Sequence, residues 1–161
     1  MREGCEQQNF TEALWQFAVD EYCRPGVEPR CLELQDDFGL DVNILLAAVF
    51  SGRRDQRWGP ALVEQLRADC EVLRDGFILP LRALRRKAKG SAPREVYESL
   101  QASELEMERW QLALLAACLG QHVGLRATQP CVEENLQCYG EVAAPEALPK
   151  LQELGRLFKD S

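Results

Sequence analysis

The sequence of 161 residues contains no apolar run long enough to cross a membrane as a helix. Its most apolar stretch, residues 42–50, is far shorter than the roughly 20 residues that such a helix needs. The first eight residues, MREGCEQQ, contain no apolar core like that of a secretory signal. We therefore expect a protein without a membrane span, located in the cytoplasm.

Paired cysteine motifs are also absent. The seven cysteines, at positions 5, 23, 31, 70, 118, 131 and 138, are odd in number and include no Cys-x-x-Cys pair. This pattern is typical neither of a disulfide framework nor of a zinc knuckle, so we expect reduced, structural thiols. Cys131 and Cys138 are two helical turns apart; a redox pair there is the less favoured alternative, because their Cα atoms would be ~10 Å apart.

Residues that carry catalysis are scarce. His122 is the only histidine, and the sequence has no Gly-x-Ser-x-Gly elbow and no phosphate-binding glycine loop. Di-iron bundles need Glu-x-x-His pairs on two helices, which excludes such a centre here. We therefore expect no metal, no cofactor and no enzymatic site; cysteine chemistry with His122 is the remaining catalytic alternative. The following glutamates are expected on a solvated face: Glu95, Glu98, Glu104, Glu106 and Glu108.

Runs that alternate between apolar and polar residues, as β-strands do, are missing, and no internal repeat is found. Hydrophobic residues make up 46% of the chain and charged residues 28%, which is ordinary for a globular protein. The net charge of −7 argues against a surface built as a whole for nucleic acid or anionic lipid. We predict a single all-α domain over residues 1–161, a bundle of about six to eight helices.

Residues 39–50 predict a buried helix at the centre of this bundle. Gly39 can adopt the left-handed conformation that ends a preceding helix, and Asp41 can accept backbone N–H groups at the start of the next one. Apolar residues then follow at helical spacing and also fill the flanks of that face. We expect this central helix at about 42–51, with Gly39, Asp41 and Asn43 in capping roles.

Start and stop signals divide the rest of the chain. A first helix, capped by Asn9 or Thr11, is expected to end near Cys23. Gly76 and Pro80 are expected to break or kink the fourth helix, and residues 90–93 form the clearest linker. The remaining helices are expected at about 29–38, 60–77, 81–89, 93–119, 132–139 and 145–158.

Several motifs resemble an uncharacterised family of small proteobacterial proteins. They are LWQF at 14–17 with the residues up to Tyr22, RPGV at 24–27, CL at 31–32, LQD at 34–36, GLDVN at 39–43 and PLRALRR at 80–86. The resemblance covers roughly residues 1–90, and residues 91–161, a long helix and short C-terminal helices, match only loosely. It implies a bacterial, cytoplasmic, helical protein and brings no catalytic residues or substrate.

The segment 82–89 is the strongest candidate for an interaction surface. It carries five basic residues and no acidic one, whereas the rest of the chain has 14 basic and 26 acidic residues. A basic face of this kind could bind phosphates, an acidic protein or RNA. The alternative is a solvated face balanced by Asp69, Asp75 and the helix dipole. The residues that share the face at helical spacing are Arg82, Arg85, Arg86 and Lys89.

A second cationic group lies in the loop after the central helix, where Arg53, Arg54 and Arg57 surround Trp58. Trp58 could shield a cleft or stack on Arg57, which would make a small-molecule or anion pocket. Trp15 and Trp110 could line such a pocket too, although large aromatic residues more often supply core area.

A third group, around the start of the central helix, consists of Asp36, Asp37, Asp41 and Asn43. These residues suggest either a carboxylate site for metal or acid–base chemistry, or capping and solvation. Capping is favoured because a calcium loop needs more regularly spaced oxygens. Asn43 could also make a buried contact to the loop at Arg53.

We therefore hypothesise a non-enzymatic interaction or regulatory protein that binds an anionic partner through the basic helix, together with the loop arginines. The alternatives are a pocket for a small molecule or anion with modest enzymatic activity, and an RNA-binding accessory protein. The sequence identifies neither the partner nor the oligomeric state.

Overall fold

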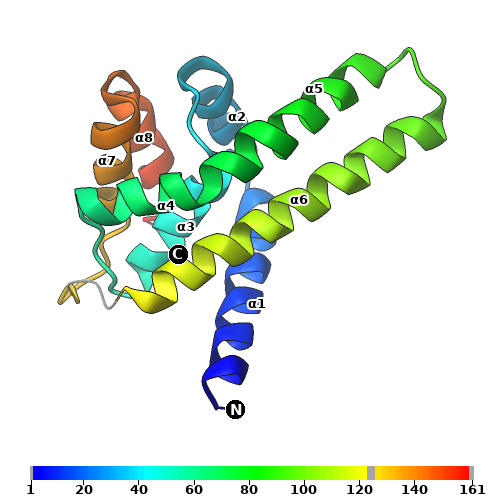
Figure 1. Ribbon diagram of the computed structural model, residues 1–161. Coiled ribbons are helices and arrows are strands. Elements are labelled where there is room, and N and C mark those ends of the chain that lie inside the picture. The colour runs from blue at the N-terminus through cyan, green and yellow to red at the C-terminus, as the bar shows by residue number, and fades with distance from the viewer. Residues whose placement is uncertain (1, 123–125, 160–161) are drawn as a thin grey trace.

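The computed structural model describes residues 2–122 and 126–159, without the side chains of residues 2 and 3. Within these ranges the chain is helical and forms no strand; one isolated bridge joins Gln56 to Arg126. The predicted all-α, multi-helix fold is confirmed (Figure 1). The elements are α1 (Arg2–Tyr22), α2 (Val27–Phe38), α3 (Val42–Arg53), α4 (Pro60–Leu73), the π-helical turn η1 (Arg74–Ile78), α5 (Leu79–Ala88), α6 (Arg94–Gln121), α7 (Val132–Ala143), the 3₁₀ turn η2 (Pro145–Ala147) and α8 (Leu148–Arg156).

Helix α3 is the buried centre of the fold, as the sequence predicts. Every residue from Ile44 to Gly52 is buried, because α1, α2, α6 and α7 all pack around this helix. The side chain of Asp41 accepts hydrogen bonds from the backbone N–H groups of Asn43 (2.9 Å) and Ile44 (3.3 Å). Gly39 ends α2 with a φ of 67°, in the left-handed region. The expected capping roles of Gly39 and Asp41 are therefore confirmed.

The end of α3 lies directly against the start of α7. A Cβ atom on Gly52 would lie 2.6 Å from the backbone nitrogen of Val132, so only glycine allows this approach. The backbone N–H of Cys131 donates to the carbonyl of Gly52 (3.0 Å). Residues 131–158 thereby cover a side of α3 that residues 1–122 leave open.

The break or kink predicted at Gly76 and Pro80 takes the form of a π-helical turn: α4 ends at Leu73 and α5 begins at Leu79, but η1 joins them without a break, and we call the three together the rod. A π turn accommodates the proline instead, because its wider hydrogen bonding (the N–H of Leu79 to the carbonyl of Arg74) spares the donor that proline lacks. The wider turn also rotates the chain. Ile78, five residues after buried Leu73, lies inside. Phe77 is 46% exposed, although in a regular α-helix its spacing of four residues from Leu73 would place it on the buried side.

Other helix boundaries also differ from the prediction. Helix α1 begins at Arg2 and not at a cap near residue 9 or 11. The hydroxyl of Thr11 donates to the carbonyl of Gln7 (3.0 Å), which satisfies it inside a helix. Helix α7 extends to Ala143, and the last predicted helix is divided into η2 and α8.

The rod packs antiparallel on α6, and α5 with the first half of α6 extends away from the other helices (Figure 1). We call residues 79–108, which comprise α5, the turn and the first half of α6, the arm, and the remaining helices the body. Helix α5 has no buried residue, and the one buried residue in the arm is Glu104. Among the described residues no helix is both long and apolar enough to span a membrane.

Candidate functional site

The predicted basic face lies on the arm, but part of it is turned inward. Arg82 donates to Glu104 through Nε (2.9 Å) and to Glu108 through a terminal nitrogen (2.9 Å). Its other terminal nitrogen donates to the side-chain oxygen of Gln35 on α2 (2.7 Å). Arg85 also pairs with Glu104. Two arginines and two glutamates thus form a partly buried cluster that joins α5, α6 and α2.

The cluster holds Glu104 in its charged form. Burial alone would raise the pKa of this carboxyl group, but hydrogen bonds from Arg85 and Arg82 outweigh burial, and the pKa lies below its ordinary value. Glu108 differs, because burial dominates there and raises its pKa despite the nearby Arg82. The side chains of Arg82 and Glu104 are only 15% and 8% exposed, so the pair is shielded from solvent.

The acids that neutralise the basic face are not the expected ones. Asp69 accepts a hydrogen bond from Gln65, and Asp75 pairs with Arg74. The counter-ions come from α6 and α2 instead. Sequence reasoning assigned the glutamates of α6 to a solvated face because the register between two antiparallel helices is not encoded by either helix alone. A signal was present, however: both helices carry complementary charges at matching i, i+3 or i+4 spacing.

The outer part of the basic face stays accessible. Arg86 is 53% exposed and pairs with Asp36 on α2 (3.0 Å), a contact between two exposed groups. Lys89 is exposed and forms no ion pair with any residue that the structure describes. Arg94, across the turn, is 85% exposed and pairs within its own helix with Glu98. The end of the arm is therefore a cationic surface.

Two of the loop arginines lie against aromatic rings. Arg53 pairs with Glu21 on α1 (2.8 Å), and its guanidinium group lies 5.5 Å from the ring centroids of Phe17 and Phe158. Arg54 lies 5.1 Å from the ring of Phe50. Such cation–π contacts cover the edge of the core and fix both side chains.

The loop and the basic helix do not form one surface. Arg57 is exposed beside the start of α4, whereas Arg82 lies 22 residues beyond Pro60 on the same rod. At about 1.5 Å per residue, the two groups are separated by ~33 Å. The loop arginines and the basic helix therefore form two separate surfaces and not one continuous face.

Trp58 belongs to the core. Its side chain is 4% exposed, and its backbone N–H donates to the buried side chain of Asn135 (2.8 Å). It does not form an open aromatic wall beside the arginines, which removes the reason for a pocket at this place. Trp15 lies partly buried under Arg109, while Trp110 is 51% exposed, contrary to the expected core position.

The acidic group at the start of α3 is a structural network. Asp41 accepts a hydrogen bond from Gln111 on α6 (2.5 Å), and Asn43 donates to the same Gln111 (2.7 Å). The expected contact of Asn43 with the loop at Arg53 is wrong. Asp36 forms an ion pair with Arg86 of the arm, and Asp37 is exposed. No group of three or more histidine, cysteine, aspartate or glutamate residues suited to a metal is found within the described ranges.

The buried cysteines lack the features of reactive thiols. All seven are free. Four of them are buried: Cys31, Cys70, Cys118 and Cys131. The structure brings Cys118 within 3.9 Å of the His122 ring, the pair considered from the sequence. Burial and the nearby Asp69 raise the pKa of this thiol to about 11, so it stays protonated at neutral pH.

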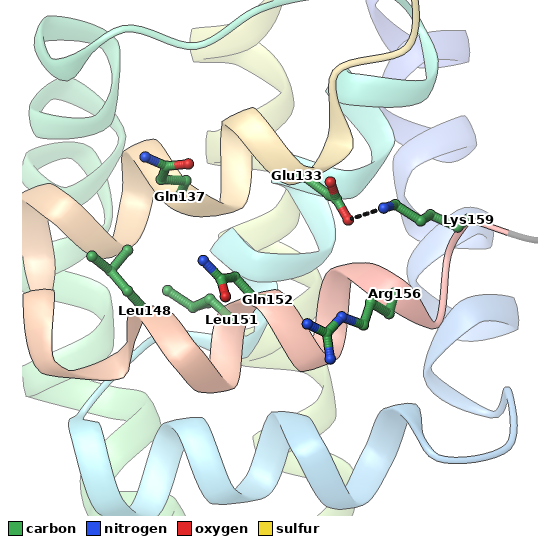
Figure 2. Close-up of a pocket in the computed structure, with 7 residues that line it drawn as sticks. All are labelled: Glu133, Gln137, Leu148, Leu151, Gln152, Arg156 and Lys159. Carbon is green, nitrogen blue, oxygen red and sulfur yellow. Dashed lines mark ion pairs between the residues drawn. The ribbon is translucent and has the colours of Figure 1, made fainter.

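Two shallow hollows occur on the body. One, of about 270 Å³, lies between α7 and α8, with the Lys159 to Glu133 ion pair (3.0 Å) at one end (Figure 2). The other, of about 250 Å³, is lined by Asp41, Arg74 and Tyr139. Arg74 and Asp41 already contact one another there, and the hydroxyl of Tyr139 accepts the backbone N–H of Asp41 (2.8 Å). Neither hollow includes Trp58 or the loop arginines.

Comparison with known proteins gives a family but no function. Residues 13–115 match the model of the family DUF2390, described as a protein of unknown function. The match includes the whole arm and extends beyond the roughly 90 residues over which the resemblance was found. Neither a curated protein nor a solved structure matches the chain significantly. The chain belongs to the DUF2390 family, whose function is unknown.

Proposed function

We propose that this protein is a non-enzymatic adaptor or regulator, and that the end of its arm binds an acidic surface of a partner protein. The observation that carries this proposal is the place of the charge. Residues 85–94 contain five basic residues and no acidic one, and they form the end of the arm, which projects from the body (Figure 1). The rest of the chain has 14 basic and 26 acidic residues.

The basic residues divide into two roles. Arg82 and Arg85 hold α5 against α6 and α2, so they position the arm. Arg86, Lys89 and Arg94 remain accessible and supply the contact; we call them the cationic tip. An arginine can bind a carboxylate with two parallel hydrogen bonds, which suits recognition of an acidic peptide or protein surface.

A cytoplasmic, reducing location fits the free thiols. All seven cysteines are unpaired, and burial raises the pKa of Cys31 and Cys70 to about 12. Disulfides rarely persist in such a compartment. The proposed origin is bacterial, as the resemblance implies.

Charge reversal at the tip tests the proposal. The variant R86E/K89E is expected to lose the proteins that the immobilised wild-type chain captures from lysate, quantified by mass spectrometry. A matched control, R67E/R156E, reverses two exposed arginines on α4 and α8 and is expected to keep them. Circular dichroism of both variants should equal that of the wild type. Equal capture by R86E/K89E and the control would contradict the assignment.

RNA is the competing ligand for the same tip. RNA binding predicts retention on immobilised RNA with a steep dependence on salt. The net charge of −7 makes this outcome the less favoured one. Retention of the wild type on RNA, lost in R86E/K89E, together with no captured protein, would replace the protein partner by RNA.

A further inference from the structure

Exposed apolar side chains are concentrated on the rod and on α6. Of the nine large apolar side chains that are exposed in the described part of the chain, seven lie on these elements. Surface apolar residues scattered singly are normal, whereas a concentration of them marks a contact site. The seven are Val72, Phe77, Leu79, Leu84, Val96, Leu105 and Trp110.

Four of these residues belong to a heptad pattern that runs along both helices. Positions 77, 81, 84 and 88 on the rod carry Phe, Leu, Leu and Ala, at spacings of four, three and four. Positions 96, 100, 103, 107, 110 and 114 on α6 carry Val, Leu, Ser, Met, Trp and Leu at the same alternating spacing. Such a repeat is typical of a coiled-coil seam, which needs a facing helix to cover it.

Both stripes lie on the same face of the helix pair formed by the rod and α6. The rings of Phe77 and Trp110 contact one another across the two helices, with centroids 6.3 Å apart. Arg82 and Glu108 pair on the other face, where Arg86 reaches α2. One face of the arm is therefore occupied by ion pairs and by α2, and the opposite face presents a half-exposed apolar seam. Phe77, Leu84, Val96 and Trp110 are 46%, 53%, 46% and 51% exposed, respectively.

The charges beside the seam are of opposite sign on its two edges. By helical periodicity, Lys87 lies on the outer edge of α5, away from Arg85. Glu95 and Glu106 lie on the outer edge of α6, away from Glu104. All three are exposed and form no ion pair with the part of the chain that the structure describes. A face with one basic and one acidic edge is complementary to itself after a two-fold rotation.

We infer that a second copy of this chain covers the seam, and that the two arms form an antiparallel four-helix bundle. A two-fold axis parallel to the arm lays α5 of each copy on α6 of the other. Each Lys87 then lies on the same edge as Glu95 and Glu106 of the second copy, and the contact occurs twice because the interface is isologous. Edge charges of this kind select partner and orientation in coiled coils.

The oligomeric state of the full chain in solution tests this inference. Sedimentation equilibrium of the wild type is expected to give twice the mass of one chain. In the variant L84E, a carboxylate would be buried in the seam without a partner, so the dissociation constant should rise at least about tenfold. The matched control is L105E, because Leu105 is 49% exposed on the same arm but off the stripe. It should remain a dimer.

A wild type that stays monomeric up to millimolar concentration would overturn the inference, and so would equal dissociation of L84E and L105E. Far-UV circular dichroism of L84E should match that of the wild type, because Leu84 is already 53% exposed in one chain.

Charge exchange tests how the two arms are oriented. K87E and E95K/E106K should each weaken the dimer, and the triple variant K87E/E95K/E106K should restore it, because the edges are exchanged. A triple variant that dimerises no more tightly than K87E or E95K/E106K would overturn the arrangement of α5 on α6.

The inference does not depend on the proposed function. Arg86 and Lys89 lie on the side of α5 away from the seam, so R86E/K89E should remain a dimer even where it loses its partner. Dimer loss without partner loss, or the reverse, separates the two proposals.

Discussion

The body and the arm are helical to the same extent but are held together by different interactions. In the body, nine consecutive residues of α3 are buried, and most of them are apolar. In the arm, α5 has no buried residue, and a carboxylate, Glu104, occupies the place of an apolar core. Apolar burial is non-directional and strong in the aggregate, whereas an ion cluster depends on each partner being present.

This difference follows from the number of neighbours. Helix α3 is surrounded by four helices, so every side of it can be covered. The arm is two helices thick, with α2 touching one face, and Glu104 is the one side chain there that is buried. A pair of helices of this size needs more than intrinsic propensity to stay together. We expect the arm to open locally more readily than the body.

The largest effect should come from a cavity in the body. Leu45 is 0% exposed, and L45A is expected to lower the free energy of unfolding by about 3 kcal/mol, from lost burial and an unfilled cavity. The same truncation in the arm, L84A, should cost less than about 1 kcal/mol at concentrations where the chain is monomeric, because Leu84 is half exposed in a single chain. Urea denaturation measures both. Equal losses would mean that the arm is packed as tightly as the body.

The next effect concerns the ion cluster. E104A leaves Arg82 and Arg85 without their shared partner, and we expect a loss of about 2 kcal/mol, less than for a fully buried pair because both arginines are partly solvated. Hydrogen exchange should accelerate in α5 and the first half of α6, with α3 unchanged. The exposed neighbour variant E106A is the control. Uniform acceleration throughout the chain would contradict separate roles for arm and body.

A smaller effect should appear as a pH dependence. The folded-state pKa of Glu104 lies below its ordinary value of 4.5, so its contribution is present above that pH and is lost as pH falls through the folded-state value. The wild type should exceed E104Q in stability at neutral pH, and the difference should shrink in the acid range below 4.5. Glu108 acts in the opposite direction, because burial and the neighbouring Glu104 raise its pKa.

Urea denaturation of the wild type and E104Q along a pH series measures this difference. A gap between the two proteins that stays constant from neutral to strongly acid pH would show that Glu104 is not held charged by the arginines.

The smallest effect is expected at the outer pair. Arg86 and Asp36 are 53% and 47% exposed, and such pairs contribute at most about 1 kcal/mol. R86A should therefore leave the denaturation midpoint almost unchanged, and the same holds at high salt. A loss as large as that of E104A would mean that the tip stabilises the arm and is not free for a partner.

Local patterns predicted the parts of the fold that depend on one helix at a time. The cap at Asp41, the stop at Gly39 and the burial of α3 follow from spacing and side-chain chemistry over a few residues. The interruption near Pro80 was located from the sequence, but its form was not, because a π turn accommodates the proline without a break and its extra residue places Phe77 at the surface.

The candidate site was predicted in composition but not in geometry. The cationic segment was identified correctly, but the partners of Arg82 and Arg85 were not, because they lie 19 to 26 residues away on a helix whose register depends on the turn between them. The distance between the loop arginines and the arm depended in turn on α4, η1 and α5 being one rod.

The sequence by itself determined that this protein is all-helical, that α3 lies at its centre and that positive charge gathers in one segment, since helical periodicity and capping act within a few residues. The tertiary structure alone decided which charges neutralise each other, which aromatic rings face outward and which surface is left uncovered. Those outcomes depend on the relative rotation and register of helices, which arise only when the helices pack.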